Sequence, residues 1–414
     1  MTRIAIDARR GPASGVRTFV DSLVGALGEA RADWSLLLMN DAPGALLRDE
    51  ESFAHELRAA DVDAYIGVQY WSPVAPLDVP QLRVVHDVYV LLEDARIPTS
   101  GELRRRLGPS TVLDGMPSDQ TPGRPIYQLL FSRGIESAGR IAVPSATTLR
   151  ELVSHFPGSV DRARVTPFAV PSMVGASRWS PPSTGFRLLN VGNGEPRRRQ
   201  LPLLALCREL WLGGLIDTLT MVGSPEFGFG EYRDRLKYAQ EKGREEGWLV
   251  VHTEISPSQL MDLYATSSAL VVSSEHEGFC YPALEAMATG LPVIGPRGGA
   301  VDDLCGDLLF GYQRFAEIAE AVVGVRETPR SRLINTAPER IRMARQRTRI
   351  AMGDAFAREI ESMITDEAER PRGRDHTGSA ASAAIAATSS GPRSNSSAPS
   401  SGPATGIAVT RGLP

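Results

Sequence analysis

Two carboxylates with seven residues between them are the side chains of this chain best placed to do chemistry. Glu277 and Glu285 lie in the string EGFCYPALEAMATGLPVI, with Gly278 and a predicted helix start in the gap. The free N–H groups and positive dipole end of a helix N-terminus suit a phosphate. Carboxylates beside it can accept hydrogen bonds from sugar hydroxyls. This combination predicts a nucleotide-sugar site.

A strand, a loop and a helix must position these carboxylates. Residues 269–272 are an apolar run, residues 273–278 are polar, and a helical pattern begins at Pro282 and stops at Gly290. A second apolar run follows at 291–294. The pattern predicts a parallel, right-handed strand-helix-strand unit, and ligands bind at the carboxyl ends of strands in such sheets.

The string around the two carboxylates resembles the E-x7-E segment of retaining glycosyltransferases of the GT-B fold, in particular glycosyltransferase family 4. The resemblance covers roughly residues 1–365 and implies an α/β fold with two Rossmann-like domains whose parallel sheets face a central cleft. It also implies transfer of a hexose from a nucleoside diphosphate sugar to a hydroxyl acceptor, with retention of anomeric configuration. In that family the first Glu contacts hydroxyls of the donor sugar and the second holds the ribose, which assigns these roles to Glu277 and Glu285.

A basic cluster follows the strand predicted at 186–191, in the loop GNGEPRRRQ before a helix. Guanidinium groups pair with phosphate oxygens, so Arg198 and Arg199 are candidate ligands of the donor diphosphate. Alternatively, the cluster is a solvated turn. By resemblance, Arg199 matches a Lys of the family, whereas Asn193 stands where relatives have an Arg. An Asn can hydrogen-bond a phosphate but cannot neutralise it.

The resemblance adds further candidates around the diphosphate. Phe279, Cys280 and Tyr281 lie at the predicted helix start, and Cys280 stands where relatives usually have Gly. Gly15 belongs to the loop ARRGPASG, between the strand RIAID and a helical pattern at 16–27. A Gly-containing loop before a helix lets the backbone approach a ligand closely, although plain turn chemistry is the commoner reason for such a loop.

His86 follows the strand predicted at 82–85, where ligands arrive in an α/β domain, and an imidazole exchanges hydrogen bonds with hydroxyls at neutral pH. Taken alone, His86 would more often be a packed or capping residue. The string VVHDVYV resembles the family's His-Asp element, which implies that His86 approaches the donor sugar as a catalytic residue beside Glu277. Glu254 and Ile255 are candidates to contact the nucleotide base, because in relatives this loop packs around the base.

The composition suits two α/β domains: the chain has 414 residues, of which 42% are hydrophobic and 23% charged. We expect an N-terminal acceptor domain at 1–170, a proline-containing linker at 171–184, and a nucleotide-sugar domain with C-terminal helices at 185–365. From residue 366 to 414 the chain is rich in Ser, Ala, Gly and Pro, and we expect disorder there because no core can be built from it.

Other properties of the chain narrow the class of protein. The net charge of −4 gives no reason to expect nucleic-acid binding. The three cysteines lack metal-ligand spacing and His252 and His276 lack acidic partners at a recognisable spacing, so we expect neither a metal nor another cofactor. The cysteine usage predicts a reducing cytoplasm. We expect neither a secretory leader nor a transmembrane span, and peripheral membrane contact stays open.

Several interpretations of the sequence stay open. The acceptor hydroxyl could belong to a glycan, a lipid or a small natural product. Asn193 and Cys280 also suit a catalytically weak or inactive homologue that acts as a binding or scaffold subunit. Another enzyme of this fold, such as a nucleotide-sugar epimerase, is a third interpretation. The occurrence of Glu277, Glu285 and His86 in one chain favours transfer.

Overall fold

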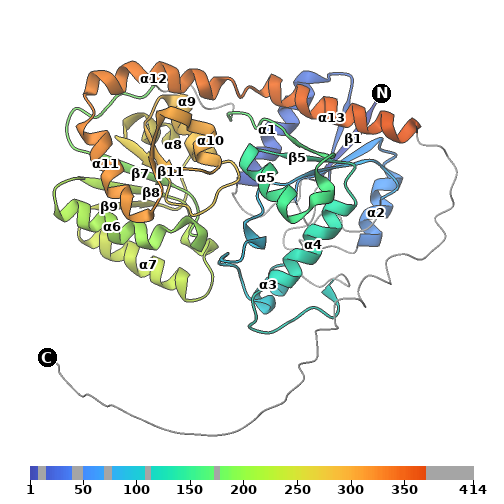
Figure 1. Ribbon diagram of the computed structural model, residues 1–414, viewed down its shortest axis with the longest axis horizontal. Coiled ribbons are helices and arrows are strands. Elements are labelled where there is room, and N and C mark those ends of the chain that lie inside the picture. The colour runs from blue at the N-terminus through green and yellow to red at the C-terminus, as the bar shows by residue number, and fades with distance from the viewer. Residues whose placement is uncertain (8–14, 40–49, 70–76, 108–112, 172–177, 370–414) are drawn as a thin grey trace, which may run out of the picture. The chain divides into compact units, whose positions relative to one another are not determined.

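Two six-stranded sheets form the framework of the protein (Figure 1). Every strand pair in both sheets is parallel. The α/β fold with two Rossmann-like domains is thereby confirmed. We call the part of the chain with the first sheet the N-terminal half and the part with the second sheet the C-terminal half. The structure is a computed structural model and describes residues 1–7, 15–39, 50–69, 77–107, 113–171 and 178–369.

The first sheet has the strand order β2-β1-β3-β4-β5-β6. Its central strands β3 and β4 are buried along their whole length, as is usual for parallel sheets, although β4 includes the polar residues Gln81 and Arg83. The strands are β1 (Arg3–Asp7), β2 (Ser35–Met39), β3 (Ala64–Gly67), β4 (Gln81–Val84), β5 (Arg140–Val143) and β6 (Ala163–Val165). The helices between them are α1 (Gly15–Ala30), α2 (Glu50–Ala59), α3 (Ser100–Leu107), α4 (Arg124–Glu136) and α5 (Ala146–His155), with 3-10 turns η1 (Tyr89–Leu91) and η3 (Pro157–Ser159).

The second sheet has the order β12-β11-β10-β7-β8-β9, so the chain starts in the middle at β7, runs to one edge and returns to β10 for the other. The strands are β7 (Arg187–Val191), β8 (Thr218–Val222), β9 (Leu249–His252), β10 (Ala269–Val271), β11 (Val293–Pro296) and β12 (Leu309–Tyr312). The helices are α6 (Gln200–Leu212), α7 (Gly230–Glu245), α8 (Pro257–Thr266), α9 (Tyr281–Thr289), α10 (Ala300–Cys305), α11 (Ile318–Glu327), α12 (Arg330–Arg345) and α13 (Arg349–Glu369). The 3-10 turns are η4 (Pro196–Arg198), η5 (Pro225–Phe227), η6 (Gly306–Leu308) and η7 (Phe315–Glu317).

Local sequence signals account for several element boundaries. The predicted strand-helix-strand unit is present as β10, α9 and β11, with Gly290 in the left-handed conformation at the end of α9. Ser145 caps α5 by accepting the backbone N–H of Thr148 at 3.1 Å. Ser256 caps α8 in a reciprocal capping box with Gln259. These caps satisfy backbone donors that the helices themselves leave unpaired.

The last helix returns to the N-terminal half, where α13 packs against α1 (Figure 1). The two helices approach closely because Gly353 of α13 faces the carbonyl of Ala26 in α1. We expected the C-terminal helices to end at residue 365, but α13 continues to Glu369. Asp366, in this last part of the helix, forms an ion pair with Arg140 of β5. The remainder of the expected tail, residues 370–414, lies outside the described residues.

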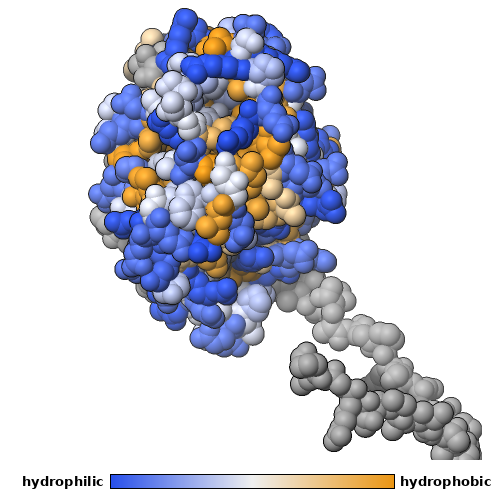
Figure 2. Space-filling view, turned by 90° about the vertical axis from the view of Figure 1, so that its left-hand side faces the viewer, coloured by the Kyte–Doolittle hydropathy of each residue, from blue (hydrophilic) through white to orange (hydrophobic). Residues whose placement is uncertain are grey.

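The surface of the described residues mixes hydrophobic and hydrophilic side chains. Leu212, Tyr238 and Val250, all in the C-terminal half, are large hydrophobic residues with exposed side chains. On the face shown in Figure 2, hydrophobic residues (orange) lie between hydrophilic ones (blue). No helix within the described ranges combines the length and the apolar character that crossing a membrane requires.

The α1–α13 contact gives a matched pair of glycine variants. A Cβ at Gly353 would overlap the Ala26 carbonyl oxygen, whereas a Cβ at Gly28, on the exposed side of α1, would meet open space. We expect Gly353→Ala to lower the free energy of unfolding by about 1–3 kcal/mol. Gly28→Ala should raise it by about 0.5–1 kcal/mol, because Ala is the better helix former. Denaturant unfolding of both variants measures this, and equal effects would contradict the packing described.

Candidate functional site

The loops that follow β7 and β10 meet where the strand order of the second sheet reverses. Such a switch point is where open parallel sheets bind ligands. The backbone N–H of Glu275 donates to the carbonyl of Arg197 at 2.9 Å, and the hydroxyl of Ser273 donates to the carbonyl of Arg198 at 2.6 Å. The fold therefore brings the predicted arginine loop against the loop that carries the first glutamate.

Glu277 is held by three side chains of these two loops. The hydroxyl of Ser274 donates to its Oε1 at 2.7 Å, and guanidinium groups of Arg197 and Arg198 lie 3.4 and 3.2 Å from its two carboxylate oxygens. Its side chain is only 7% exposed. Buried carboxylates are stable when paired and hydrogen-bonded in this way. Glu277 is thus fixed in one orientation.

Arg197 forms ion pairs with the carboxylates of Glu195 and Glu277. Its Nε lies 2.7 Å from Glu195, and its Nη1 donates to the backbone carbonyl of His276 at 3.2 Å. Burial acts to lower the pKa of Arg197, but the carboxylates of Glu195, Glu277 and Asp87 outweigh it and raise that pKa well above its ordinary value. Arg197 is therefore a permanent cation of the site.

Arg199 occupies a constrained position between η4 and α6. Its backbone is in the left-handed region, with φ 50° and ψ 34°. Its Nε lies 3.0 Å from Oε2 of Glu275. The site therefore has three guanidinium groups facing three carboxylates, namely Arg197, Arg198 and Arg199 against Glu195, Glu275 and Glu277. Arg198 and Arg199, predicted to bind a diphosphate, each have a carboxylate partner here.

Cys280 begins α9 in a conformation that favours glycine. It is the N-cap residue, with φ 75° and ψ 74°, and a side chain with a Cβ costs roughly 1–2 kcal/mol there. Burial raises the pKa of its thiol well above the ordinary value, and the charge of Glu277 adds to this. The thiol is therefore protonated and unreactive. The backbone of Cys280 thus adopts the left-handed conformation that a Gly at this position would adopt more easily.

Phe279 and Tyr281, on either side of Cys280, differ in their surroundings. The ring of Phe279 is buried against Phe168 at a centroid distance of 5.2 Å, so its side chain serves packing. Tyr281 has a buried hydroxyl without a hydrogen-bond partner among the described residues. A Cβ on Gly15 would lie 3.7 Å from the Tyr281 ring, which places the start of α1 beside the start of α9.

Glu285 lies one helical turn further along α9. Its Oε2 accepts a hydrogen bond from the hydroxyl of Tyr264 at 2.7 Å. Burial raises the pKa of Glu285 to about 7, although the bond from Tyr264 acts in the opposite direction. Burying a carboxylate away from water lowers the stability of the folded protein, and carboxylates with a pKa perturbed in this way are typical of functional sites.

His86 contacts the same loop through its backbone. A Cβ on Gly278 would overlap the His86 carbonyl oxygen, so only glycine fits there. The Nε2 of His86 lies 3.0 Å from the carbonyl of Val68, and the ring packs edge-on against Phe19 at 4.9 Å. Burial lowers the pKa of His86 to about 4, so the imidazole is neutral. Because a carbonyl can only accept, Nε2 carries the proton and Nδ1 is left as an acceptor.

The remaining predicted residues lie at the margin of this cluster. Asn193 accepts a hydrogen bond from the backbone N–H of Ser224 at 3.2 Å through its side-chain oxygen. Glu254 is exposed after β9, and Ile255 packs partly against the core. Within the described ranges, no hydrogen bond or ion pair links Glu254 to the Glu277 cluster.

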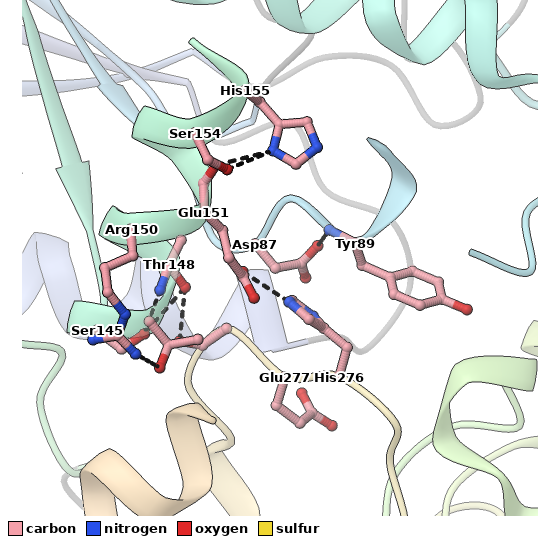
Figure 3. Close-up of polar contacts among 12 residues, drawn as sticks. Asp87, Tyr89, Ser145, Thr148, Arg150, Glu151, Ser154, His155, His276 and Glu277 are labelled. Carbon is pink, nitrogen blue, oxygen red and sulfur yellow. Dashed lines mark hydrogen bonds and ion pairs between the residues drawn. The ribbon is translucent and has the colours of Figure 1, made fainter. Parts of the chain in front are cut away.

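Sequence reasoning missed the contacts that the β10 loop makes with the N-terminal half. His276 is hydrogen-bonded to Glu151 of α5 at 2.9 Å, with Asp87 nearby (Figure 3). Burial acts to lower the pKa of His276, but the bond to Glu151 and the charges of Asp87 and Glu151 outweigh it, so the pKa is raised. The alternating charges of the string EHE signal polar partners, but the partners in the N-terminal half, Glu151 and Tyr89, lie 125 or more residues away in the chain.

Metal binding has no visible support in the described part of the chain. No group of three or more His, Cys, Asp or Glu side chains is arranged there to hold a metal ion. The cations present at the site are the arginines.

Comparison with known proteins identifies part of the chain. Residues 178–313 match the family described as glycosyl transferases group 1. The serotype-specific mannosyltransferase WbdA of Escherichia coli is 36% identical over 104 residues, which cover 25% of this chain and 12% of that protein. The GDP-mannose-dependent alpha-mannosyltransferase of Mycobacterium tuberculosis is 31% identical over 262 residues, 55% of this chain and 62% of that protein. The chain thus matches less than two thirds of the length of either relative.

Solved structures confirm the GT-B fold. Sucrose-phosphate synthase from Thermosynechococcus elongatus has a TM-score of 0.55 at 16% identity, and covers 89% of this chain and 98% of its own. Anabaena HepE, in complex with UDP and glucose, has a TM-score of 0.60 at 14% identity, and covers 87% of this chain and 100% of its own. At such low identity the likeness concerns the fold alone.

The raised pKa of Glu285 predicts how stability depends on pH. Between about pH 4.5 and 7 the folded protein holds a proton that the unfolded chain releases, so the burial of Glu285 destabilises the fold increasingly as pH rises through that window. Glu285→Gln keeps an acceptor for Tyr264 and removes the charge. We expect it to raise the free energy of unfolding at pH 8 by on the order of 3 kcal/mol and by little at pH 4.5.

Denaturant unfolding across pH 4.5–8 checks this prediction. Glu241→Gln is the control, because Glu241 lies exposed on α7 and its loss should leave the profile unchanged. Parallel profiles for Glu285→Gln and the wild type would contradict the assigned burial of the charge.

Proposed function

We propose, starting from the group 1 glycosyl transferase domain at residues 178–313, that this protein transfers a hexose from a nucleoside diphosphate sugar to a hydroxyl acceptor. The observation that carries the proposal is the meeting of the E-x7-E loop with the arginine loop at the switch point of the second sheet. Residues 185–365 would form the donor domain and residues 1–170 the acceptor domain.

The nucleoside diphosphate would lie over the start of α9. Arg198 and Arg199 would pair with the phosphates, next to the backbone of Cys280 and Tyr281 at the positive end of the helix dipole. Glu285 would accept the ribose hydroxyls. Its pKa of about 7 makes this contact strongest above neutral pH, where the carboxylate is ionised. Glu254 and Ile255 would contact the base.

The sugar would lie between Glu277 and His86. The neutral imidazole of His86 has Nδ1 as an acceptor, and Glu277 has two fixed carboxylate oxygens. Both groups can accept hydrogen bonds from sugar hydroxyls. The names of the related mannosyltransferases, one of them GDP-mannose-dependent, favour mannose as the hexose and GDP as the nucleotide.

The reaction would proceed with retention and without an enzyme nucleophile. The acceptor oxygen bonds to the anomeric carbon on the face from which the diphosphate leaves. The bond between that carbon and the phosphate oxygen breaks, and the leaving phosphate takes the acceptor's proton. The arginines and the α9 N-terminus stabilise the negative charge that develops on the diphosphate. Glu277 stabilises the positive charge on the sugar ring.

A scaffold role is the second candidate function, and the balanced charges of the site are the observation that favours it. Each of the three arginines has a carboxylate partner, and Asn193 adds no charge. A diphosphate would therefore meet a site without a large excess of positive charge. A homologue that binds a nucleotide weakly, and transfers nothing, is consistent with this arrangement.

Replacing the Glu277 carboxylate distinguishes the transferase function from the scaffold function. Glu277→Gln keeps the shape of the side chain and removes the charge that would stabilise the transition state. We expect turnover of GDP-mannose to fall on the order of a hundredfold, equivalent to about 3 kcal/mol. The affinity for GDP should not fall, because the change releases Arg198 from its carboxylate. Donor turnover and calorimetric GDP binding measure the two effects.

Glu195→Gln is the matched control, since it also removes a carboxylate partner of Arg197 but lies outside the proposed sugar site. Its turnover should stay within tenfold of the wild type. Undiminished turnover in Glu277→Gln would remove that residue from catalysis. A wild type that binds GDP but transfers to no acceptor in a broad screen would favour the scaffold.

A further inference from the structure

We propose that Tyr89 and Glu275 are positioning residues that hold Arg199 in the orientation that receives the donor diphosphate. Tyr89 lies in η1 of the N-terminal half, whereas Arg199 precedes α6 in the C-terminal half. The N-terminal half would thereby set the affinity for a donor that the C-terminal half binds. This inference rests on the proposed function, because it takes Arg199 as a ligand of the diphosphate.

The carboxylate of Glu275 connects the two residues. Its Oε1 accepts a hydrogen bond from the hydroxyl of Tyr89 at 2.5 Å, and its Oε2 lies 3.0 Å from Nε of Arg199. The backbone N–H of Glu275 is also fixed, by its bond to the carbonyl of Arg197. With its side chain only 15% exposed, Glu275 has both oxygens and its main chain anchored. A carboxylate held in this way can in turn fix its cation.

Tyr89 is itself a rigid anchor. Its side chain is 5% exposed, and its hydroxyl accepts the backbone N–H of Arg96 at 2.8 Å while donating to Glu275. Its own backbone N–H donates to Asp87 at 3.1 Å (Figure 3). Burial and the neighbouring Glu275 raise the pKa of Tyr89 far above neutrality. The hydroxyl therefore remains protonated and always donates to Glu275.

The geometry at Arg199 leaves its outer nitrogens available. Glu275 contacts Nε, while Nη1 and Nη2 make no hydrogen bond or ion pair within the described ranges, and the side chain is 33% exposed. A guanidinium is planar, so a contact at Nε together with the Phe315 ring, 5.9 Å away, sets the direction in which the two Nη groups point. Phosphate oxygens bind such a fork with two parallel hydrogen bonds.

A positioning role and a simple charge effect of Glu275 predict opposite changes in the affinity for an anion when Glu275 is replaced. If Glu275 acted only through its charge, its removal would strengthen binding of an anion, because one negative charge near the phosphates would be lost. If Glu275 orients Arg199, its removal frees a side chain with several rotatable bonds, and ordering that side chain again weakens binding. Glu275→Gln therefore distinguishes the two roles. Tyr89→Phe tests the same orientation without changing any charge.

Calorimetric binding of GDP to the full chain is the test. We expect Tyr89→Phe and Glu275→Gln each to weaken binding at least fivefold, with unchanged melting temperature for Tyr89→Phe within a few degrees. Thr147→Val is the matched control. It removes another side-chain hydrogen bond between the two halves, the one from Thr147 to Asp303 at 2.8 Å, which has no link to Arg199. Its affinity should stay within twofold of the wild type.

A double-mutant cycle excludes a merely structural role for Tyr89. In an Arg199→Ala background, Tyr89→Phe should cause no further loss of GDP affinity, because there is no guanidinium left to orient. Additive losses, an unchanged affinity of Tyr89→Phe, or tighter binding by Glu275→Gln would each overturn the inference. If the wild type binds no nucleoside diphosphate, the proposed function fails as well. Normal binding with an unaffected Tyr89→Phe would overturn this inference alone.

Discussion

The close approach of two backbones, at Gly278 and His86, is the constraint on which the arrangement of the site depends. Any side chain at Gly278 would overlap the His86 carbonyl oxygen. The carbonyl of Gly278 also accepts a hydrogen bond from Thr148 of α5 at 3.2 Å. Gly278, in the loop after β10, therefore contacts the N-terminal half in two places, at His86 and at Thr148. Glu277 directly precedes Gly278 in the chain, so this contact holds the backbone of Glu277 close to the backbone of His86.

The charges of the site follow from this approach. Loops that carry three arginines cannot be brought together with little access to water unless carboxylates compensate them, since the cost of an unpaired buried charge is several kcal/mol. Glu195, Glu275 and Glu277 provide that compensation. In contrast, no ion pair with a cation is found for Glu285 among the described residues, and burial raises its pKa. The arginines are thus stabilised by ion pairs with glutamates, whereas the burial of the Glu285 carboxylate lowers the stability of the folded protein.

The sequence was sufficient to predict features that depend on local patterns. These include the β10-α9-β11 unit and the strand and helix on either side of the arginine loop, whereas the two-domain fold with parallel sheets was implied by the family resemblance. It could not predict the partners that tertiary contacts supply. Tyr89 and Glu275 are separated by 186 residues, and no periodicity relates them. The bond of His86 to the carbonyl of Val68 is a similar case, since the sequence does not show which ring nitrogen of His86 carries the proton.

The central claim is that a nucleoside diphosphate binds across the start of α9, at the switch point of the second sheet. The most direct test is a crystal structure of the protein grown with GDP. We expect the diphosphate within hydrogen-bonding distance of Arg199 and the backbone at the start of α9, and the ribose hydroxyls on the carboxylate of Glu285. A nucleotide bound elsewhere on the chain, with Glu285 still bonded only to Tyr264, would contradict the account.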